Sequence, residues 1–137
     1  MRVIADTGPI YALIDEDDSW HSKVKRVIEE KRLELILPST ILPEICYLAN
    51  KYLGAEVEIG FVKAVAEGEI KVEEVDIKDY RSALKHLKTY KKLNIGFVDA
   101  TVIAVAERLE MYTLLTTDRR HFSQIKTGKG KSFNLLP

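Results

Sequence analysis

Four carboxylates lie where the chain is otherwise strongly apolar, and their positions suggest that they act together. Asp6 follows the apolar run RVIA, and Asp118 follows the run YTLLTT. Glu44 lies in PSTILPEICYL, shortly after the run ELIL, and Asp99 lies near the start of FVDATVIAVAERL. If these side chains converge, their mutual repulsion raises some of their pKa values and destabilises the fold unless a cation is bound.

The types of these side chains indicate which cation and which chemistry. Carboxylate oxygens are preferred ligands of magnesium and manganese, whereas zinc favours Cys and His. One or two such ions can orient a phosphodiester, activate a water molecule and stabilise the leaving oxygen. The four carboxylates therefore suggest metal-assisted phosphodiester hydrolysis, with Mg²⁺ or Mn²⁺ as the cofactor.

The elements that must position these residues alternate along the chain. Apolar or β-branched runs predict strands at 2–5, 34–37 and 112–117, a weaker one at 70–75, and an edge strand at 133–136. Apolar residues at helical spacing predict helices at 19–33, 39–53, 55–68, 77–93 and 97–109. This alternation predicts a single domain over 1–137, an α/β/α three-layer sandwich with a mainly parallel sheet of four to five strands.

Such a sheet would bring the acids to one edge. In an open parallel sheet the ligand crevice lies at the carboxyl ends of the strands, and Asp6 and Asp118 follow two of these ends. The segment 97–109 is apolar almost all round and should be buried. Asp99, in its first turn, then needs a partner to offset the cost of burying a charge.

Glu44 is expected in the first turn of the helix that follows the second strand. Ser39 or Thr40 could cap this helix, and Pro43 is tolerated in its first turn. Glu44 falls about 60° from Ile41 around the helix and therefore flanks its buried stripe. That stripe is expected to contain Ile41, Ile45, Leu48 and Tyr52.

Each acid also has a purely structural explanation. Asp6 and Asp118 could cap the helices that follow them, Asp99 could favour a helix N-terminus, and Glu44 could be a surface residue. The four together are harder to explain in this way. Three of them end or closely follow apolar strands, and the fourth opens the helix that is expected to be buried.

The tripeptide Asp6-Thr7-Gly8 allows two other enzymatic interpretations. An aspartic protease needs two such carboxylates sharing a proton, and the chain has one copy, followed by Pro9 at an expected helix start. A phosphoryl-transfer enzyme could use Asp6 as nucleophile, but such phosphatases carry a second acid at the position of Gly8. A non-catalytic RNA-binding or scaffold protein on the same fold is a third alternative.

Composition excludes several classes of protein. The chain has 137 residues, 46% of them hydrophobic and 31% charged, and no apolar stretch long enough for a membrane span or a secretory signal. We therefore expect a cytoplasmic protein, with the single cysteine, Cys46, as a small buried residue. Lys plus Arg equals Asp plus Glu, 21 of each, so a polyanionic substrate must be held by local basic residues or by metal.

Four blocks in order, VIADTGPIYALID, LPSTILPEICYL, NIGFVDATVIAVAERL and LLTTDRRHF, resemble the PIN-domain ribonucleases over essentially the whole chain. In size the chain is most similar to VapC-type toxins of toxin–antitoxin pairs. The resemblance implies an RNA-cleaving endonuclease whose acidic pocket, Asp6, Glu44, Asp99 and Asp118, binds Mg²⁺ or Mn²⁺. It also implies a homodimer held inactive by a small antitoxin; housekeeping RNA processing is the alternative role.

The resemblance extends to residues around this pocket. Thr7 and Thr116 match hydroxyl positions that help to order the pocket in the family. Gly8 replaces a serine that is often found there, and we expect this exchange to have no consequence. Other residues are candidates from their position alone: Arg119, Arg120 and His121 follow Asp118 and could contact RNA phosphates, or could be solvated residues of a short turn.

The acidic segment DEDDSWH at 15–21 is a further candidate for metal binding. We interpret it instead as a solvated connection between two elements, with Ser19 capping the helix that follows.

Overall fold

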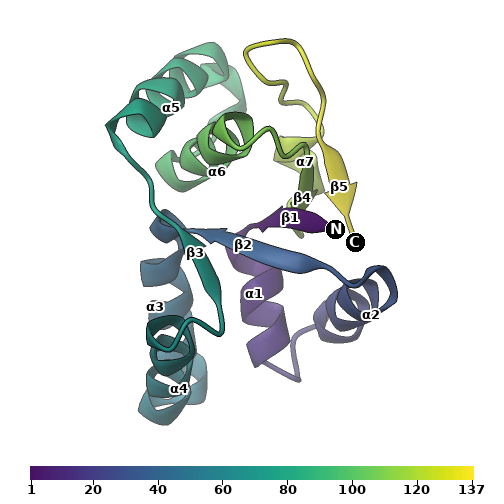
Figure 1. Cartoon of the computed structure of the whole chain (residues 1–137), viewed down its shortest axis with the longest axis vertical. Coiled ribbons are helices and arrows are strands. Elements are labelled where there is room, and N and C mark those ends of the chain that lie inside the picture. Colours follow the sequence, from purple (N-terminus) through teal and green to yellow (C-terminus); the bar gives the residue numbers. More distant parts are fainter.

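A five-stranded parallel sheet forms the centre of the computed structural model, which describes residues 1–137 (Figure 1). Its strands, in the order β3-β2-β1-β4-β5, are β1 (Arg2–Ala5), β2 (Glu34–Pro38), β3 (Lys71–Glu73), β4 (Thr113–Leu115) and β5 (Asn134–Leu136). In the centre, Ile4 of β1 lies opposite Ile36 of β2 on one side and Leu114 of β4 on the other. The chain turns in opposite directions on either side of β1, so the crevice of an open sheet falls at its carboxyl end.

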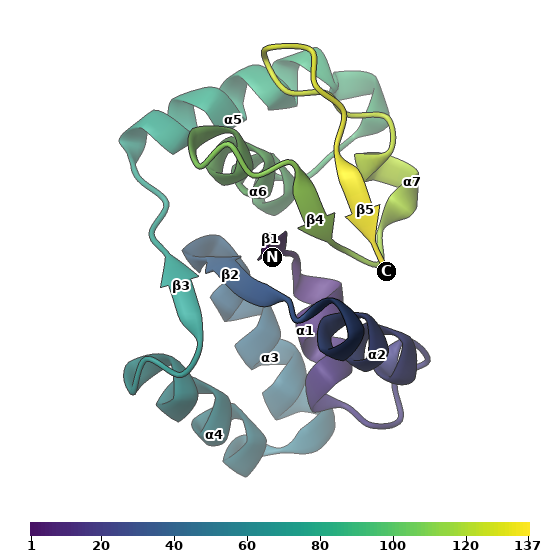
Figure 2. The same cartoon turned by 45° about the vertical axis from the view of Figure 1, so that its right-hand side comes forward.

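Helices cover both faces of the sheet. They are α1 (Thr7–Ile14), α2 (His21–Lys31), α3 (Leu42–Leu53), α4 (Ala55–Ala66), α5 (Ile77–Thr89), α6 (Phe97–Arg108) and the single turn α7 (Arg119–Phe122), with 3₁₀ turns η1 (Ser39–Ile41) and η2 (Lys91–Leu93). Figures 1 and 2 show α5 and α6 on one side of the sheet and α1 to α4 on the other. The predicted three-layer α/β/α sandwich is confirmed.

Helix α6 is the most buried helix of the molecule. Every residue from Ala100 to Ala106 is buried, as its apolar sequence predicted. The cluster of buried apolar residues includes residues of α6 together with the central strands β1 and β4 and with Ile41 and Ile45. Because the rest of α6 is packed in this core, the position of Asp99 in the first turn of the helix is fixed.

The predicted strands and helices are present, with ends that differ by a few residues, but two predicted caps are wrong. Helix α3 has Ile41 at its N-cap position, without a side-chain hydrogen bond. The Ser39 hydroxyl instead accepts a hydrogen bond from the Val75 backbone N–H, and the Thr40 hydroxyl lies 2.7 Å from the Thr101 hydroxyl. Helix α2 begins after Trp20 with no side-chain cap, so Ser19 does not have the predicted role.

Two predictions of burial in α3 are also wrong. Tyr52 is 61% exposed, and Ala49 is buried on the inner face of the helix together with Ile45. Cys46 is only partly buried. Tyr52 lies in the last turn of α3, and its ring packs edge-on against Tyr11 of α1, so it borders the core and does not enter it.

None of the helices has the length and apolar character that crossing a membrane requires.

Candidate active site

Asp6 lies at the carboxyl end of the central strand and is the most deeply buried of the four predicted acids. Its side chain is 8% exposed and caps α1 by accepting a hydrogen bond from the Thr7 backbone N–H at 2.8 Å. Burial, aided by the negative charges of Asp99 and Glu44, raises the pKa of Asp6 to about 6, although hydrogen bonds from Thr7 and Thr116 act in the opposite direction. Asp6 is therefore an acid held in an environment that lacks a positive charge.

Two threonines connect Asp6 to the other acids. The Thr116 hydroxyl donates to Oδ2 of Asp6 at 3.1 Å and accepts from the Asp118 backbone N–H at 3.0 Å. The Thr7 hydroxyl donates to Oε2 of Glu44 at 3.1 Å. The Thr116 hydroxyl thus connects the residues that follow β1 and β4, and the Thr7 hydroxyl connects the start of α1 to the first turn of α3.

Asp99 and Asp118 face each other across the site. Asp99 is half-buried, and burial followed by the charge of Asp118 raises its pKa. Asp118 caps the short helix α7 through the His121 backbone N–H at 3.1 Å, and the Nδ1 atom of His121 lies 2.9 Å from its other oxygen. One ligand atom from each of Asp99, Asp118 and His121 lies within 4.8 Å of the others.

Glu44 lies at the edge of the site. It is in the first turn of α3 and is solvent-exposed, in agreement with the predicted position beside the buried stripe. Its negative charge raises the pKa of both Asp6 and Asp99. The structure therefore brings all four predicted acids together at the carboxyl ends of β1, β2 and β4.

The donor set fits a divalent cation. Burial and the charges of the neighbouring acids raise the pKa values of Asp6 and Asp99, and the structure places no lysine or arginine in an ion pair with any of the four acids. A bound cation removes that repulsion. Carboxylates from Asp6, Asp99 and Asp118 suit a hard ion such as Mg²⁺ or Mn²⁺, and the nearby imidazole of His121 is compatible with Mn²⁺.

The residues after Asp118 differ in what they contact. Arg119 donates to the Leu135 carbonyl at 3.1 Å and to the carbonyl of Pro137, so its guanidinium holds α7 to β5. Arg120 is exposed, and its side chain forms no hydrogen bond or ion pair, which leaves it available to a phosphate. His121 contacts Asp118 and belongs to the acidic site.

Two local features of the site were not predicted. His121 was considered only as an RNA contact, although its position three residues after the Asp118 cap is the one from which a side chain reaches back to a cap. Gly8 was expected to be exchangeable, but a Cβ atom there would lie 2.2 Å from the Thr117 hydroxyl oxygen. A side chain at position 8 therefore requires Thr117 to move.

Comparison with known proteins identifies the family. The family model of the PIN domain matches residues 3–128. This chain belongs to the PIN-domain family. The resemblance seen in the sequence is thus confirmed, and the match includes Asp6, Glu44, Asp99 and Asp118.

Individual relatives of this PIN domain are similar over most of their length. It is 27% identical to ribonuclease VapC26 of Mycobacterium tuberculosis over 98% of this chain and 100% of that protein. Its fold is similar to that of Mycobacterium tuberculosis VapC20, described as a sarcin-ricin loop cleaving toxin, with a TM-score of 0.74, 22% identity, and 82% and 86% of the two chains covered. It is also similar to a chain of VapBC2 from Rickettsia felis bound to a promoter DNA fragment, with a TM-score of 0.70, 17% identity and full coverage of both chains.

Proposed function

We propose that this PIN domain is a metal-dependent endoribonuclease and the toxin of a VapBC-type toxin–antitoxin pair. The observation that carries the proposal is the convergence of Asp6, Glu44, Asp99 and Asp118 at one edge of the sheet. The similarity to a VapC ribonuclease over the whole chain supports RNA as the substrate. Such a toxin acts in the cytoplasm, where its RNA substrate is found.

Asp6, Asp99 and Asp118 would hold Mg²⁺ or Mn²⁺, with Glu44 at the open side of the site. When bound, the ion orients the phosphodiester, lowers the pKa of a water molecule and stabilises charge on the leaving oxygen. The residues of the chain supply the geometry. Thr116 fixes Asp6 relative to Asp118.

Residues around the four acids complete the proposed mechanism. Thr7 fixes Glu44 through its hydroxyl, and His121 fixes the rotamer of Asp118 through Nδ1. Arg120 is placed to bind a phosphate of the RNA next to the scissile bond. Arg119, although exposed, keeps α7 in place through β5 and is a weaker candidate for direct RNA contact.

The direct test is cleavage of single-stranded RNA by purified protein with Mg²⁺ or Mn²⁺. We expect Asp6→Asn and Asp99→Asn each to lower kcat by about a hundredfold or more, since metal assistance contributes several kcal/mol to catalysis. Chelation with EDTA should abolish cleavage, and either ion should restore it. Circular dichroism and thermal melting report whether the variants remain folded.

Asp17→Asn is the matched control, because Asp17 is an exposed aspartate of the acidic segment 15–21, which follows the opposite end of α1 from Asp6. Its activity should equal that of the wild type, as expected for a solvated connection. Equal cleavage by the wild type, Asp6→Asn and Asp99→Asn would contradict the proposed function and indicate a contaminating nuclease or a non-catalytic fold.

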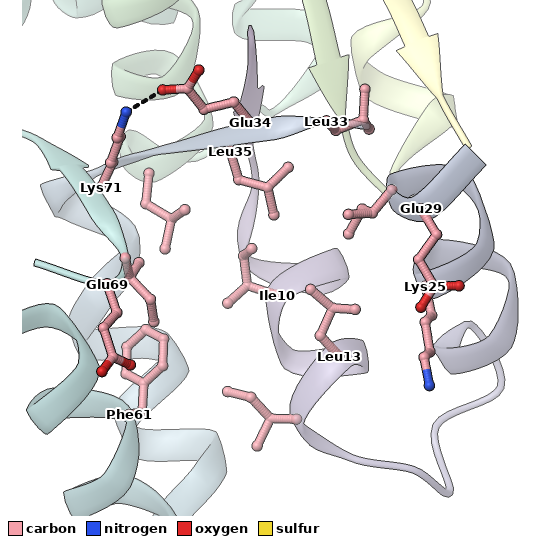
Figure 3. A pocket seen from close by; sticks show the side chains of 14 residues that line it. Ile10, Leu13, Lys25, Glu29, Leu33, Glu34, Leu35, Phe61, Glu69 and Lys71 are labelled. Carbon is pink, nitrogen blue, oxygen red and sulfur yellow. Dashed lines mark hydrogen bonds and ion pairs between the residues drawn. The ribbon is translucent and has the colours of Figure 1, made fainter. Parts of the chain in front are cut away.

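An apolar groove supports the proposed antitoxin partner. It has a volume of about 550 Å³ and lies between α1, α2, β2 and α4 (Figure 3). Figure 3 shows Ile10, Leu13, Leu35 and Phe61 pointing into it. Its rim carries charges, Lys25 and Glu29 on the α2 side, Glu69 near β3, and the ion pair of Lys71 with Glu34.

A groove of this kind fits the apolar face of a helix, with charged residues at the rim fixing its orientation. We assign it to a segment of the antitoxin. A short reading frame beside the gene, encoding a small DNA-binding protein, would identify that partner.

A further inference from the structure

The charges of this neutral protein are strongly divided along the chain. Residues 1–79 contain 10 Lys and Arg against 17 Asp and Glu, a net charge of −7. Residues 80–137 contain 11 Lys and Arg against 4 Asp and Glu, a net charge of +7. Between Asp79 and Asp99, and again after Asp118, the sequence contains no acid at all. The two basic stretches therefore begin or end at proposed metal ligands.

Hydrogen bonds join these two basic stretches in the fold. The Tyr90 hydroxyl at the end of α5 accepts from the Lys126 backbone N–H at 2.8 Å and donates to the Lys126 carbonyl at 3.1 Å. The two ends of the loop 126–131 are joined by a hydrogen bond, in which the Thr127 backbone N–H donates to the Lys131 carbonyl at 2.8 Å. Helix α5 and the loop 126–131 thus form one continuous surface.

A pocket of about 440 Å³ lies at this junction. It is lined almost entirely by polar residues, with Lys85 and Thr89 on the α5 side and Lys126 and Thr127 on the loop side. A smaller cavity beside it includes Lys129, and the Lys131 ammonium lies 4.5 Å from the ring centroid of Tyr112 in that cavity's wall. Three lysines, Lys85, Lys126 and Lys129, therefore line two adjoining cavities, and a fourth, Lys131, lies over the ring of Tyr112 in the wall of the smaller one.

The single carboxylate in this pocket is already engaged in hydrogen bonds within the protein. Glu107 bonds to Nε2 of His86 and accepts from the Gly128 backbone N–H at 2.8 Å. Burial acts to raise the pKa of Glu107, but these two hydrogen bonds outweigh it and lower the pKa. None of the four lysines forms an ion pair. The pocket thus presents ammonium groups that form no ion pair within the protein and can bind an anion.

The pocket also lies within reach of an RNA strand bound at the acidic site. Glu107 is on the same helix as Asp99, eight residues further along, which is about 12 Å along the helix axis. Roughly three to four nucleotides of a stacked strand cover that length. Because the acidic site repels phosphates when no cation is bound, a basic contact at this distance would offset the repulsion.

We propose that the pocket between α5 and the loop 126–131 is a second RNA-binding site, in which Lys85 and Lys126 bind a backbone phosphate of the substrate a few nucleotides from the scissile bond. This inference rests on the proposed ribonuclease function and extends it. A protein with no net charge needs local basic residues to bind a polyanionic substrate, and we assign that role to the lysines of this pocket.

The test is the double variant Lys85→Gln/Lys126→Gln. Binding is measured by fluorescence anisotropy with a labelled RNA of roughly 16 nucleotides, as a function of salt concentration. The slope of log K against log[salt] should fall by about 0.7, since the contact to one single-strand phosphate contributes about that amount. The KM for that RNA should rise about tenfold with kcat unchanged, whereas cleavage of an RNA of about four nucleotides should be unaffected.

Lys31→Gln/Lys63→Gln is the matched control, because both lysines are exposed on α2 and α4 and the charge change is identical. An equal loss of affinity in the control would overturn the proposal and indicate non-specific attraction. Unchanged salt slope and KM in Lys85→Gln/Lys126→Gln would also overturn it while leaving the nuclease function intact. If no RNA is cleaved at all, the nuclease proposal fails, and the anisotropy measurement still decides the binding site.

Discussion

The residues of the acidic site serve the fold and the proposed chemistry at once. Asp6 and Asp118 cap the helices that follow them, as expected if their role were purely structural. They also lie close to Asp99 and Glu44, as the proposed chemistry needs. The two explanations are compatible because a carboxylate has two oxygens. In Asp6, Oδ1 accepts the capping hydrogen bond, whereas Oδ2 accepts from Thr116 and remains at the site.

The raised pKa of Asp6 predicts how stability depends on pH in the absence of metal. Its pKa is about 6 in the folded protein and 3.8 in the unfolded chain, so the folded state binds the proton more tightly. Stability contributed by this proton is fully present below pH 3.8 and is lost as the pH rises through about 6. The loss amounts to about 3 kcal/mol by pH 8, as an order of magnitude.

We therefore expect the difference in unfolding free energy between wild type and Asp6→Asn to shift by that amount between pH 4 and pH 8. Urea denaturation in EDTA at several pH values measures it. Addition of Mn²⁺ at pH 8 should restabilise the wild type and have little effect on Asp6→Asn. A difference that does not change with pH would show that the pKa of Asp6 is not raised in the folded protein.

The four acids could be predicted from the sequence because three of them end or closely follow apolar runs and the fourth opens an apolar helix. This pattern can be seen without knowledge of the fold. Sequence reasoning missed the roles of His121 and Gly8 because these depend on contacts at atomic distance. His121 reaches Asp118 only because α7 is a single turn capped by that acid. A side chain at position 8 would displace the Thr117 hydroxyl, because Thr117, more than a hundred residues away in sequence, occupies that space.

At the level of the elements, hydrophobic periodicity predicted the strands and helices well, but the predicted N-caps of α2 and α3 were wrong. Ser39 and Thr40 are residue types that often cap helices, yet their hydroxyls have other partners. Ser39 bonds to Val75, in the segment that follows β3, and Thr40 bonds to Thr101 of α6. These tertiary contacts hold the start of α3 against α6 and so fix Glu44 relative to Asp99. Local propensity was overridden by partners that the sequence pattern does not reveal.

The groove between α1, α2 and α4 gives a prediction about inhibition. Leu13 of α1 and Ile28 of α2 line it and are only partly buried. We expect Leu13→Glu/Ile28→Glu to abolish binding of the antitoxin encoded beside the gene, because charges would be buried against its apolar face. Cleavage of RNA should be unchanged, so the variant should be a nuclease that the antitoxin no longer inhibits.

Val62→Glu is the control for this experiment, since Val62 is an exposed apolar residue of α4 outside the groove lining. Isothermal titration calorimetry with purified antitoxin measures binding, and the cleavage assay measures inhibition. Full inhibition of Leu13→Glu/Ile28→Glu would place the antitoxin on another surface.

Across the whole molecule, α5 separates two surfaces of different character. One side of the helix, with Lys85 and Thr89, lines the basic pocket. Another side carries Ile77 and Leu84, which are 63% and 51% exposed. These two apolar residues are seven positions apart and therefore share one side of the helix, turned by roughly 100° from Lys85.

This apolar side extends to the acidic site and predicts where a homodimer would form. Tyr80 of α5 stacks on Phe97 of α6 with ring centroids 5.9 Å apart, and Phe97 precedes Asp99 by two residues. Exposed apolar residues gathered beside a functional site indicate a protein interface. Two copies meeting there would place the first turn of α6, which carries Asp99, beside the interface.

We therefore expect Leu84→Arg to convert a dimer into a monomer in sedimentation velocity, because two charges would face each other across a two-fold interface. Ile59→Arg is the control, since Ile59 is equally apolar and exposed but lies on α4. The control should sediment as the wild type does. Two outcomes would contradict this assignment: a wild type that remains monomeric at high concentration, or a Leu84→Arg protein that still dimerises. In either case the apolar side of α5 would be free for another role, the stacking of RNA bases on Tyr80 and Phe97.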